Sequence, residues 1–405
     1  MKPGNHGKWL LAGTIAAYCL IGVEIVIMIT PFALYFYSVY GPVLEFLNRH
    51  PSLSWTTEFF LPHMVFLDDP LILAVSYLQL LLVVGLLLFC TAAIPLYYGR
   101  FTGKGVVSFG FYARVRHPQY LFLAVSGLGL LLYWPRFIIL LFYVTMLFVY
   151  YLLARHEEWR MQQSDPEEYE RYMRRTPMFL PGEPGGRIYR PLFGWLRPKW
   201  FGLTAAYGAS LILAVGLAMG LRSYTIEQFP TVQADSMTLL PVFPRPAGEV
   251  REVYDKALAD EKVRGVIREI PEANLVYIFP GDFFLTALVT EEERRFSDDV
   301  IERFPEVLEW HQHKFRGGLG RFFKIFYNFV STLGTVETDY HIERLVFVRV
   351  TDHRGRPLPP EHLFDLGTSR RPVLIVDLDA DDHRLLTVMR TTDNHKWGTM
   401  PMPSF

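Results

Sequence analysis

Long apolar stretches constrain the fold of this chain most, because each is close to the length that crosses a membrane. About 20 apolar residues in a helix span the roughly 30 Å of hydrocarbon in a bilayer. Four stretches meet or nearly meet this length, and a shorter fifth, 119–134, is followed by Pro135 and another apolar run. We expect the fifth to form the first arm of a tight helical hairpin, which gives about five transmembrane helices. The four longer stretches lie at about 9–37, 70–97, 136–154 and 201–222.

The charge is divided unevenly along the chain. Residues 1–222 carry 18 Lys and Arg against 12 Asp and Glu, whereas residues 223–405 carry 22 against 29. The first apolar run is too long for a signal peptide and no small-residue cleavage site follows it, so we expect it to be retained. The predicted organisation is an all-α polytopic membrane bundle over 1–222, followed by an acidic soluble α+β domain over 223–405.

The basic residues of the first half predict how the bundle is oriented. Segment 98–118 has four Lys or Arg and no acid, and segment 155–200 has nine Lys or Arg. Segment 38–69 has one Arg against four acids. Because basic loops stay in the cytoplasm, we expect a multi-pass protein with the N-terminus, 98–118 and 155–200 cytoplasmic. The loop 38–69 and the domain 223–405 are expected outside the cytoplasm.

The second half has the pattern of an α+β domain. We expect helices over about 247–269 and 291–315, a third apolar-aromatic helix over 321–333, and a hairpin turn at "ADDH" between the last two strands. An acidic domain has no evident reason to bind nucleic acid, and a contact with a protein partner is the default expectation for it. Strand patterns lie at 274–280, 343–350, 372–379 and 384–390.

The residues that carry chemistry cluster at the two open ends of the predicted hairpin. "ARVRHPQY" precedes the first arm, and "ARHEEW" follows the second arm with Glu157 40 positions after His117. Pro118 suits the first position of a helix, where its missing N–H costs nothing. The N–H groups of Gln119 and Tyr120 would then be donors at a positive helix end, which suits a carboxylate or phosphate.

The carboxylate pair supplies the complementary charge. Glu157 or Glu158 could accept hydrogen bonds from an ammonium group, so a ligand with both a carboxylate and an ammonium would bridge the two ends. The amino-acid part of S-adenosylmethionine is such a ligand. The alternative is that Arg-His is an interfacial anchor and Glu-Glu a solvated flank, as at many membrane helices.

Residues from about 104 to 182 resemble the catalytic core of the isoprenylcysteine carboxyl methyltransferase and phospholipid methyltransferase superfamily. The shared pattern is R-H-P-x-Y, a helical hairpin, E-E, and an "EEYERYMRR" helix that closes on "TPMFLPG". The resemblance implies a membrane-embedded, S-adenosylmethionine-dependent methyltransferase with a lipophilic or membrane-borne acceptor. This acceptor would be a carboxylate, an amine or a thiol.

The same resemblance implies which residues form the site. Arg116 or Arg155 would orient an acidic acceptor during methyl transfer. The family's substrate-side arginine falls on Leu153 here, which is a departure from the pattern. The implied cofactor contacts are Tyr112, His117, Pro118, Gln119, Tyr120, Glu157 and Glu158.

Two other readings of the motif remain open. Membrane sterol reductases carry a similar R-H-P-x-Y and E-E pattern and use NADPH, so the basic turn could serve a pyrophosphate. A bundle that has lost activity could also anchor the outer domain within a larger complex.

Two further groups of residues are weaker candidates. Glu24 lies inside the first apolar run, where an acid is either functional or placed near a wet bundle interior. His311 and His313 lie in a pattern that predicts a helix, which would point the two rings apart. We therefore expect no metal site.

Overall fold

The computed structural model describes residues 5–37, 41–50, 52–62, 65–102, 107–164, 166–269, 273–281 and 340–390. The expected helices at 291–315 and 321–333, together with His311 and His313, lie outside these described ranges. The chain forms two compact units. The helical unit comprises residues 1–44 and 70–222, and the sheet unit comprises residues 45–69 and 223–405.

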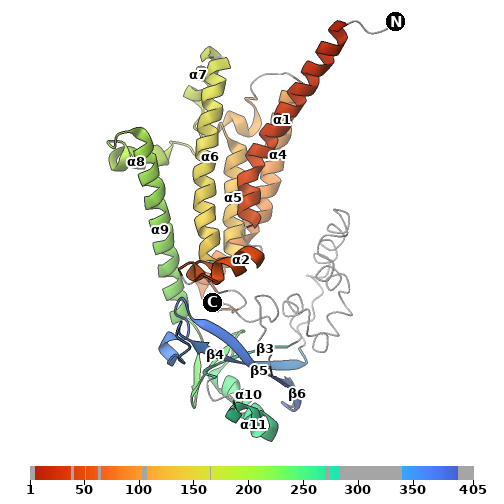
Figure 1. The fold of residues 1–405 in the computed structure, drawn as a ribbon, viewed down its shortest axis with the longest axis vertical. Helices are drawn as coiled ribbons and strands as arrows, with labels where there is room; N and C mark the ends of the chain where they lie inside the picture. Colours follow the sequence, from red (N-terminus) through yellow and green to blue (C-terminus); the bar gives the residue numbers. More distant parts are fainter. Residues whose placement is uncertain are drawn as a thin grey trace. The chain divides into compact units, whose positions relative to one another are not determined.

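Among its described residues, the helical unit has four helices that are long and apolar enough to cross a membrane. Their apolar spans are Tyr18–Phe36, Pro70–Gly99, Phe137–Ser164 and Lys199–Glu227, which agrees with the four long stretches expected from the sequence. The fifth expected stretch forms helix α5, which has only 16 residues and is shorter than these spans. The helices are α1 (Asn5–Tyr37), α2 (Gly41–Asn48), α3 (Pro70–Tyr77), α4 (Leu81–Phe101), α5 (Pro118–Tyr133), α6 (Phe137–Ser164), α7 (Pro166–Arg175), α8 (Pro184–Phe193) and α9 (Lys199–Glu227) (Figure 1).

Small residues allow α4 and α5 to pack closely. A Cβ atom built at Gly129 would overlap the backbone of Leu82, and one built at Gly85 would overlap the backbone of Ser126. The Ser126 hydroxyl also donates to the Leu82 carbonyl at 2.9 Å. Close backbone approach through glycine and serine is how membrane helices gain packing contacts, since lipid supplies no hydrophobic drive between helices.

The tyrosines of the bundle connect three helices. The Tyr35 hydroxyl on α1 donates to the Gly127 carbonyl on α5 at 2.8 Å, and the Tyr143 hydroxyl on α6 donates to the Ala124 carbonyl at 3.1 Å.

The outward faces of the helices are apolar and exposed. Ile212, with 77% of its surface exposed, shows this most strongly. Such a surface is stable only against an apolar environment, so these faces fit contact with lipid.

Where the structure describes the sheet unit, it is a six-stranded mixed sheet in the order β1-β2-β3-β4-β5-β6. Strands β2 and β3 are parallel, and all other neighbours are antiparallel. The four strands expected from the sequence are present as β3 to β6, and the expected "ADDH" turn joins β5 and β6. Strands β1 and β2 were not expected from the sequence. The strands are β1 (Val232–Ala234), β2 (Met237–Pro241), β3 (Leu275–Pro280), β4 (Ile342–Thr351), β5 (Ser369–Asp379) and β6 (Leu385–Arg390).

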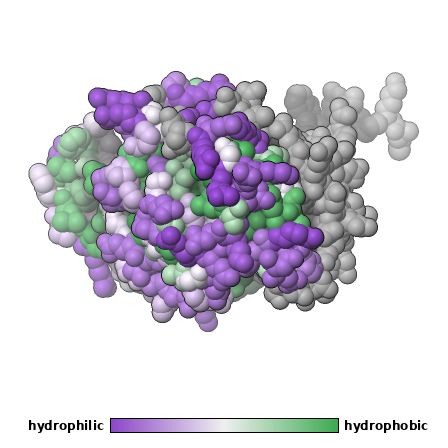
Figure 2. All heavy atoms as spheres, turned by 90° about the horizontal axis from the view of Figure 1, so that it is seen from below, coloured by the Kyte–Doolittle hydropathy of each residue, from purple (hydrophilic) through white to green (hydrophobic). Residues whose placement is uncertain are grey.

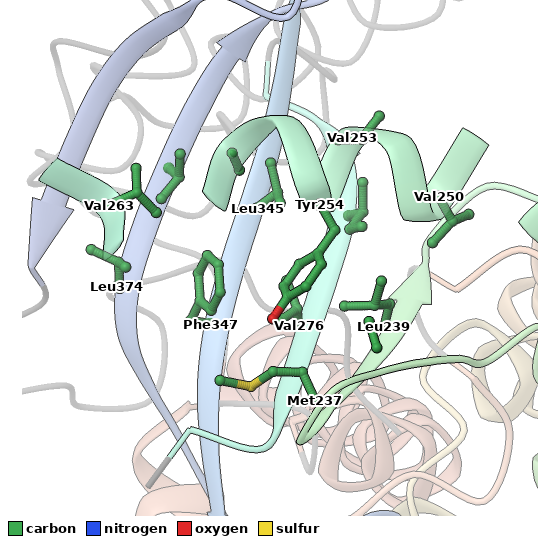
Figure 3. Packing of buried hydrophobic residues seen from close by; sticks show 14 of the residues in the cluster. Met237, Leu239, Val250, Val253, Tyr254, Val263, Val276, Leu345, Phe347 and Leu374 are labelled. Atoms are coloured by element: carbon green, nitrogen blue, oxygen red, sulfur yellow. The ribbon is translucent and has the colours of Figure 1, made fainter. Parts of the chain in front are cut away.

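Two helices, α10 (Ala247–Ala259) and α11 (Glu261–Glu269), form the crossover from β2 to the parallel strand β3. The expected continuous helix over 247–269 is thus divided at Asp260, whose backbone is extended. Val250, Val253 and Tyr254 recur at helical spacing and pack with Phe347 in the core (Figure 3). The opposite side of these helices is polar, and Figure 2 shows this face of the unit as mainly hydrophilic.

The segment 45–69 belongs to the sheet unit although it precedes α3 in the chain. The Phe66 N–H donates to the Val242 carbonyl at 2.8 Å, and its ring stacks on Phe243. The Gly367 N–H donates to the Glu58 carboxylate at 2.5 Å. The sequence predicts a loop of the membrane domain over 38–69, and residues 45–69 of it group with the sheet unit.

Candidate functional site

The two ends of the α5–α6 hairpin meet in a compact polar cluster. α5 begins at Pro118 and α6 continues past Glu158, so the "RHPQY" turn and the carboxylate pair lie side by side. The segment after α7 closes over this turn, because the Arg116 and His117 N–H groups donate to the Pro177 and Met178 carbonyls at 2.9 and 3.1 Å. We call the following residues the hairpin-end cluster: Tyr112, Arg116, His117, Gln119, Tyr120, Glu157 and Glu158.

Glu158 is the buried member of the carboxylate pair. Its side chain is 5% exposed, and its Oε1 accepts a hydrogen bond from Arg116 Nε at 2.6 Å. The Arg116 Nη1 donates to the carbonyls of Met173 and Thr176. Arg116 therefore joins α5, α6 and the end of α7, and its donors are used largely by the protein itself.

Glu157 is the accessible member of the pair. Its side chain is 40% exposed, although one oxygen accepts a 2.5 Å hydrogen bond from the Tyr120 hydroxyl. Its other oxygen lies 3.4 Å from His117 Nδ1. These contacts fix the orientation of the carboxylate and leave it partly open to a ligand.

His117 is enclosed between the two carboxylates. It is 3% exposed, and its Nε2 lies 3.5 Å from Glu158 Oε1. Neither ring nitrogen makes an aligned hydrogen bond within the described residues. Burial by itself would lower the pKa of His117, but the close negative charges of Glu157 and Glu158 outweigh it, and the pKa is raised.

The first turn of α5 is held by aromatic and amide side chains. The Tyr112 hydroxyl donates to Gln119 Oε1 at 3.2 Å, and the Tyr172 hydroxyl donates to the Tyr112 carbonyl at 2.7 Å. Burial raises the pKa of Tyr172 to about 12, so this hydroxyl stays a neutral donor. Pro118 is the first residue of the helix, as the sequence predicted. The N–H groups in such a first turn have no acceptor within the helix.

Arg155 differs from Arg116 in its surroundings. Its side chain is 62% exposed, and its Nη1 lies 4.0 Å from Glu158 Oε2. It projects beside the cluster rather than into it, and its guanidinium is accessible to an external anion.

The structure adds residues that the sequence reasoning missed. The Phe179 ring lies 5.9 Å from the His117 ring, and the Tyr150 ring stacks on Tyr120 at 4.9 Å. The Glu183 carboxylate accepts from the Met178 N–H at 3.0 Å and lies 3.6 Å from Arg116 Nη2. Tyr150 could have been found from the sequence, because it lies about two helical turns before Glu157 and therefore on the same face of α6.

Glu24 lies outside this cluster. Its carboxylate forms a 2.6 Å ion pair with Arg160, which joins α1 to α6. The pair explains how an acid is accommodated in the first apolar helix. Among the described residues, no group of three or more His, Cys, Asp or Glu side chains could hold a metal ion.

Comparisons of the chain with protein-family models, with curated proteins and with solved structures found no match.

Proposed function

We propose that this protein is an integral membrane methyltransferase that uses S-adenosylmethionine and acts on a lipophilic or membrane-borne acceptor. The observation that supports the proposal is that the two adjacent carboxylates differ in burial and in hydrogen-bond partners. Glu158 is buried against Arg116, whereas Glu157 is oriented by Tyr120 and His117 and remains 40% exposed.

The residues present suit the amino-acid part of S-adenosylmethionine. The exposed oxygen surface of Glu157 is an acceptor for an ammonium group. The first turn of α5 offers backbone N–H donors and a positive helix end for a carboxylate. The buried ring nitrogens of His117, which lack aligned partners among the described residues, lie between these two features. When bound, S-adenosylmethionine supplies a methyl group on a positively charged sulfur.

The protein's own residues then have positioning tasks. Tyr120 and His117 hold the Glu157 carboxylate in one orientation, and Arg116 holds Glu158 together with the segment that follows α7. Transfer of a methyl group by in-line displacement depends mainly on alignment of donor and acceptor. No charged catalytic group of the protein is required at the reacting carbon.

Arg155 is the residue best suited to an acidic acceptor. Its guanidinium is exposed, and it lies on the same helix as the carboxylate pair. Arg116 is the second candidate for this role, but its contacts with Glu158, Met173 and Thr176 make it a positioning residue. An acceptor carboxylate would form a bidentate pair with a free guanidinium.

We propose that the cluster faces the cytoplasm. The segments that flank it, 98–118 and 155–200, carry the excess of basic residues that stays on the cytoplasmic side. S-adenosylmethionine is a water-soluble donor and would reach the cluster from that side. The acceptor would arrive through the lipid that surrounds the apolar helices.

Calorimetric titration of the purified full-length protein tests the proposal. We expect S-adenosylmethionine to bind, and Glu157→Gln and His117→Ala each to abolish the binding while the protein stays folded and extractable. Glu170→Gln is the matched control, because Glu170 is an exposed carboxylate paired with Arg174 on α7. Binding of NADPH alone would support a reductase, and binding of neither ligand would support an inactive anchoring subunit.

The acceptor is identified by a second experiment. Membranes that contain the protein are incubated with methyl-labelled donor, and the lipids and lipophilic small molecules are analysed by mass spectrometry. We expect label in a prenylcysteine carboxylate, a phospholipid amine or a small lipophilic acid or thiol. The Glu157→Gln protein should leave that product unlabelled.

A further inference from the structure

Helix α8 presents an exposed apolar stripe. Ile188 and Leu192 lie four residues apart on this helix and are 61% and 57% exposed. Side chains at this spacing lie on one face of a helix. Trp195 follows two residues after the end of α8 and is 71% exposed. Exposed apolar side chains of this size indicate contact with an apolar partner.

The packing of α8 within the helical unit leaves this stripe uncovered. The helix contacts the start of α9 through a neighbouring side, because a Cβ atom on Gly202 would lie 2.8 Å from both the Phe193 carbonyl and the Tyr189 hydroxyl. The Tyr189 and Phe193 rings also contact each other, with centroids 6.1 Å apart. The aromatic side of α8 therefore faces α9, and the Ile188 side faces outward.

The same segment is strongly basic. Residues 184–200 contain no acid, and their four Lys or Arg side chains are exposed. Arg187 and Arg190 lie on the polar side of α8, while Arg197 and Lys199 follow in the link to α9. This combination of an apolar stripe beside basic residues is the pattern of a helix that lies in a membrane interface.

The position of α8 in the chain places it at that interface. The membrane-spanning helix α9 begins at Lys199, and Trp200 and Phe201 are 65% and 47% exposed in its first turn. α8 ends at Phe193, so its end lies within about 20 Å of the span's first residue even if the link were fully extended. Within the helical unit, α8 lies at the end of α9 and across its direction (Figure 1).

We propose that α8 is a docking surface for anionic lipid. Ile188, Leu192 and Trp195 insert at the boundary between headgroups and acyl chains, and the four basic side chains contact negatively charged headgroups. This role does not depend on the proposed methyl transfer. It concerns how the loop between α7 and α9 is held at the membrane surface.

Spin labels on neighbouring residues of α8 test this proposal in reconstituted vesicles. Cys19 and Cys90 are replaced by Ala, and a nitroxide is attached in Ile188→Cys or in Arg187→Cys, which lies on the polar side. Collision rates with oxygen, which concentrates in lipid, are compared with those for a neutral nickel chelate, which stays in water. We expect oxygen to dominate severalfold at position 188 and the nickel chelate to dominate at position 187.

The charge requirement is tested in the same samples. Phosphatidylcholine vesicles with and without phosphatidylglycerol are compared, and we expect the oxygen-to-nickel ratio at position 188 to rise severalfold with the anionic lipid. Arg190→Gln combined with Arg197→Gln should remove most of that rise. The proposal is overturned if position 188 is as accessible to the nickel chelate as position 187. It is also overturned if the oxygen-to-nickel ratio at position 188 does not change with the anionic lipid. Protection of position 188 from both reagents would also overturn it, since a protein partner or second copy would then cover the stripe.

Discussion

Arg116 and Glu158 lie 42 residues apart in the sequence and form a buried, 2.6 Å hydrogen-bonded ion pair at the open end of the α5–α6 hairpin. The pair determines the chemistry of the carboxylate next to it. Because Arg116 neutralises Glu158, only Glu157 remains to accept an external cation. The two adjacent acids therefore differ: Glu158 is buried against Arg116, and Glu157 stays partly exposed.

Replacing Arg116 with Met should destabilise the helical unit. The change leaves the Glu158 charge buried without its guanidinium and removes two hydrogen bonds to backbone carbonyls. Breaking a buried pair in this way costs about 3–5 kcal/mol. Unfolding by SDS in mixed micelles measures the loss. Arg174→Met, which breaks an exposed pair with Glu170, should cost no more than about 1 kcal/mol; equal losses in the two variants would contradict a structural role for Arg116.

The two members of the carboxylate pair should respond differently to the same substitution. Glu157→Gln changes a 40% exposed side chain and should remove S-adenosylmethionine binding, with a stability change below about 1 kcal/mol. Glu158→Gln removes the charge that faces Arg116 and should lower stability by about 3–5 kcal/mol. Calorimetry and SDS unfolding of both proteins separate the two effects. If Glu158 were essential for binding and Glu157 for stability, the roles proposed for the two carboxylates would be wrong.

The stability of the helical unit should depend on pH through His117. Its pKa is raised in the folded protein, so its contribution is fully present below the ordinary value near 6.5 and is lost as pH rises through the folded-state pKa. The charged groups that face it are Glu157 and Glu158, with Arg116 beside Glu158. The difference in unfolding free energy between the wild type and His117→Gln should therefore shrink from pH 6 to pH 9. A difference that is constant over this range would show that the imidazole is not charged in the folded state.

The sequence indicated much of the fold because its strongest signals are local. The four long apolar stretches and the strands β3 to β6 follow directly from hydrophobic length and alternation. Strands β1 and β2 were not predicted because they are only three and five residues long. Every residue of β2 is buried, so it has no alternation of buried and exposed positions. Helix α8 was not predicted because its glycines and prolines are typical of a loop.

The candidate site could be predicted only in part, for a related reason. The hairpin placed His117 and the carboxylate pair together, since two arms of similar length return to one surface. Which carboxylate is buried depends on Arg116, whose three acceptors come from α6 and the end of α7. Contacts with Phe179 and Glu183 likewise depend on how the segment after α7 folds back, which residue spacing does not show.

Gly129 should be essential for the contact between α4 and α5. A Cβ atom at this position would overlap the backbone of α4 at Leu82, where neither helix can yield by rotating a side chain. Gly129→Val should therefore cost at least about 1–3 kcal/mol, the usual cost of overpacking. Gly208→Val is the control, because a Cβ atom there meets nothing within 4 Å. Similar SDS unfolding curves for the two variants would argue against close packing of α4 on α5.

The segment before α3 should stabilise the sheet unit rather than serve as a simple connection. Phe59 is 1% exposed in this segment, and the nearby Glu58 accepts the Gly367 N–H. Truncating a buried Phe costs about 3–5 kcal/mol, because the cavity left behind closes only partly. Phe59→Ala should therefore speed hydrogen exchange in peptides from β4 and β5 of the full-length protein, as followed by mass spectrometry. Leu53→Ala, at a 39% exposed position of the same segment, should leave that exchange nearly unchanged. If both variants exchanged at the wild-type rate, the stability of the sheet would not depend on this segment.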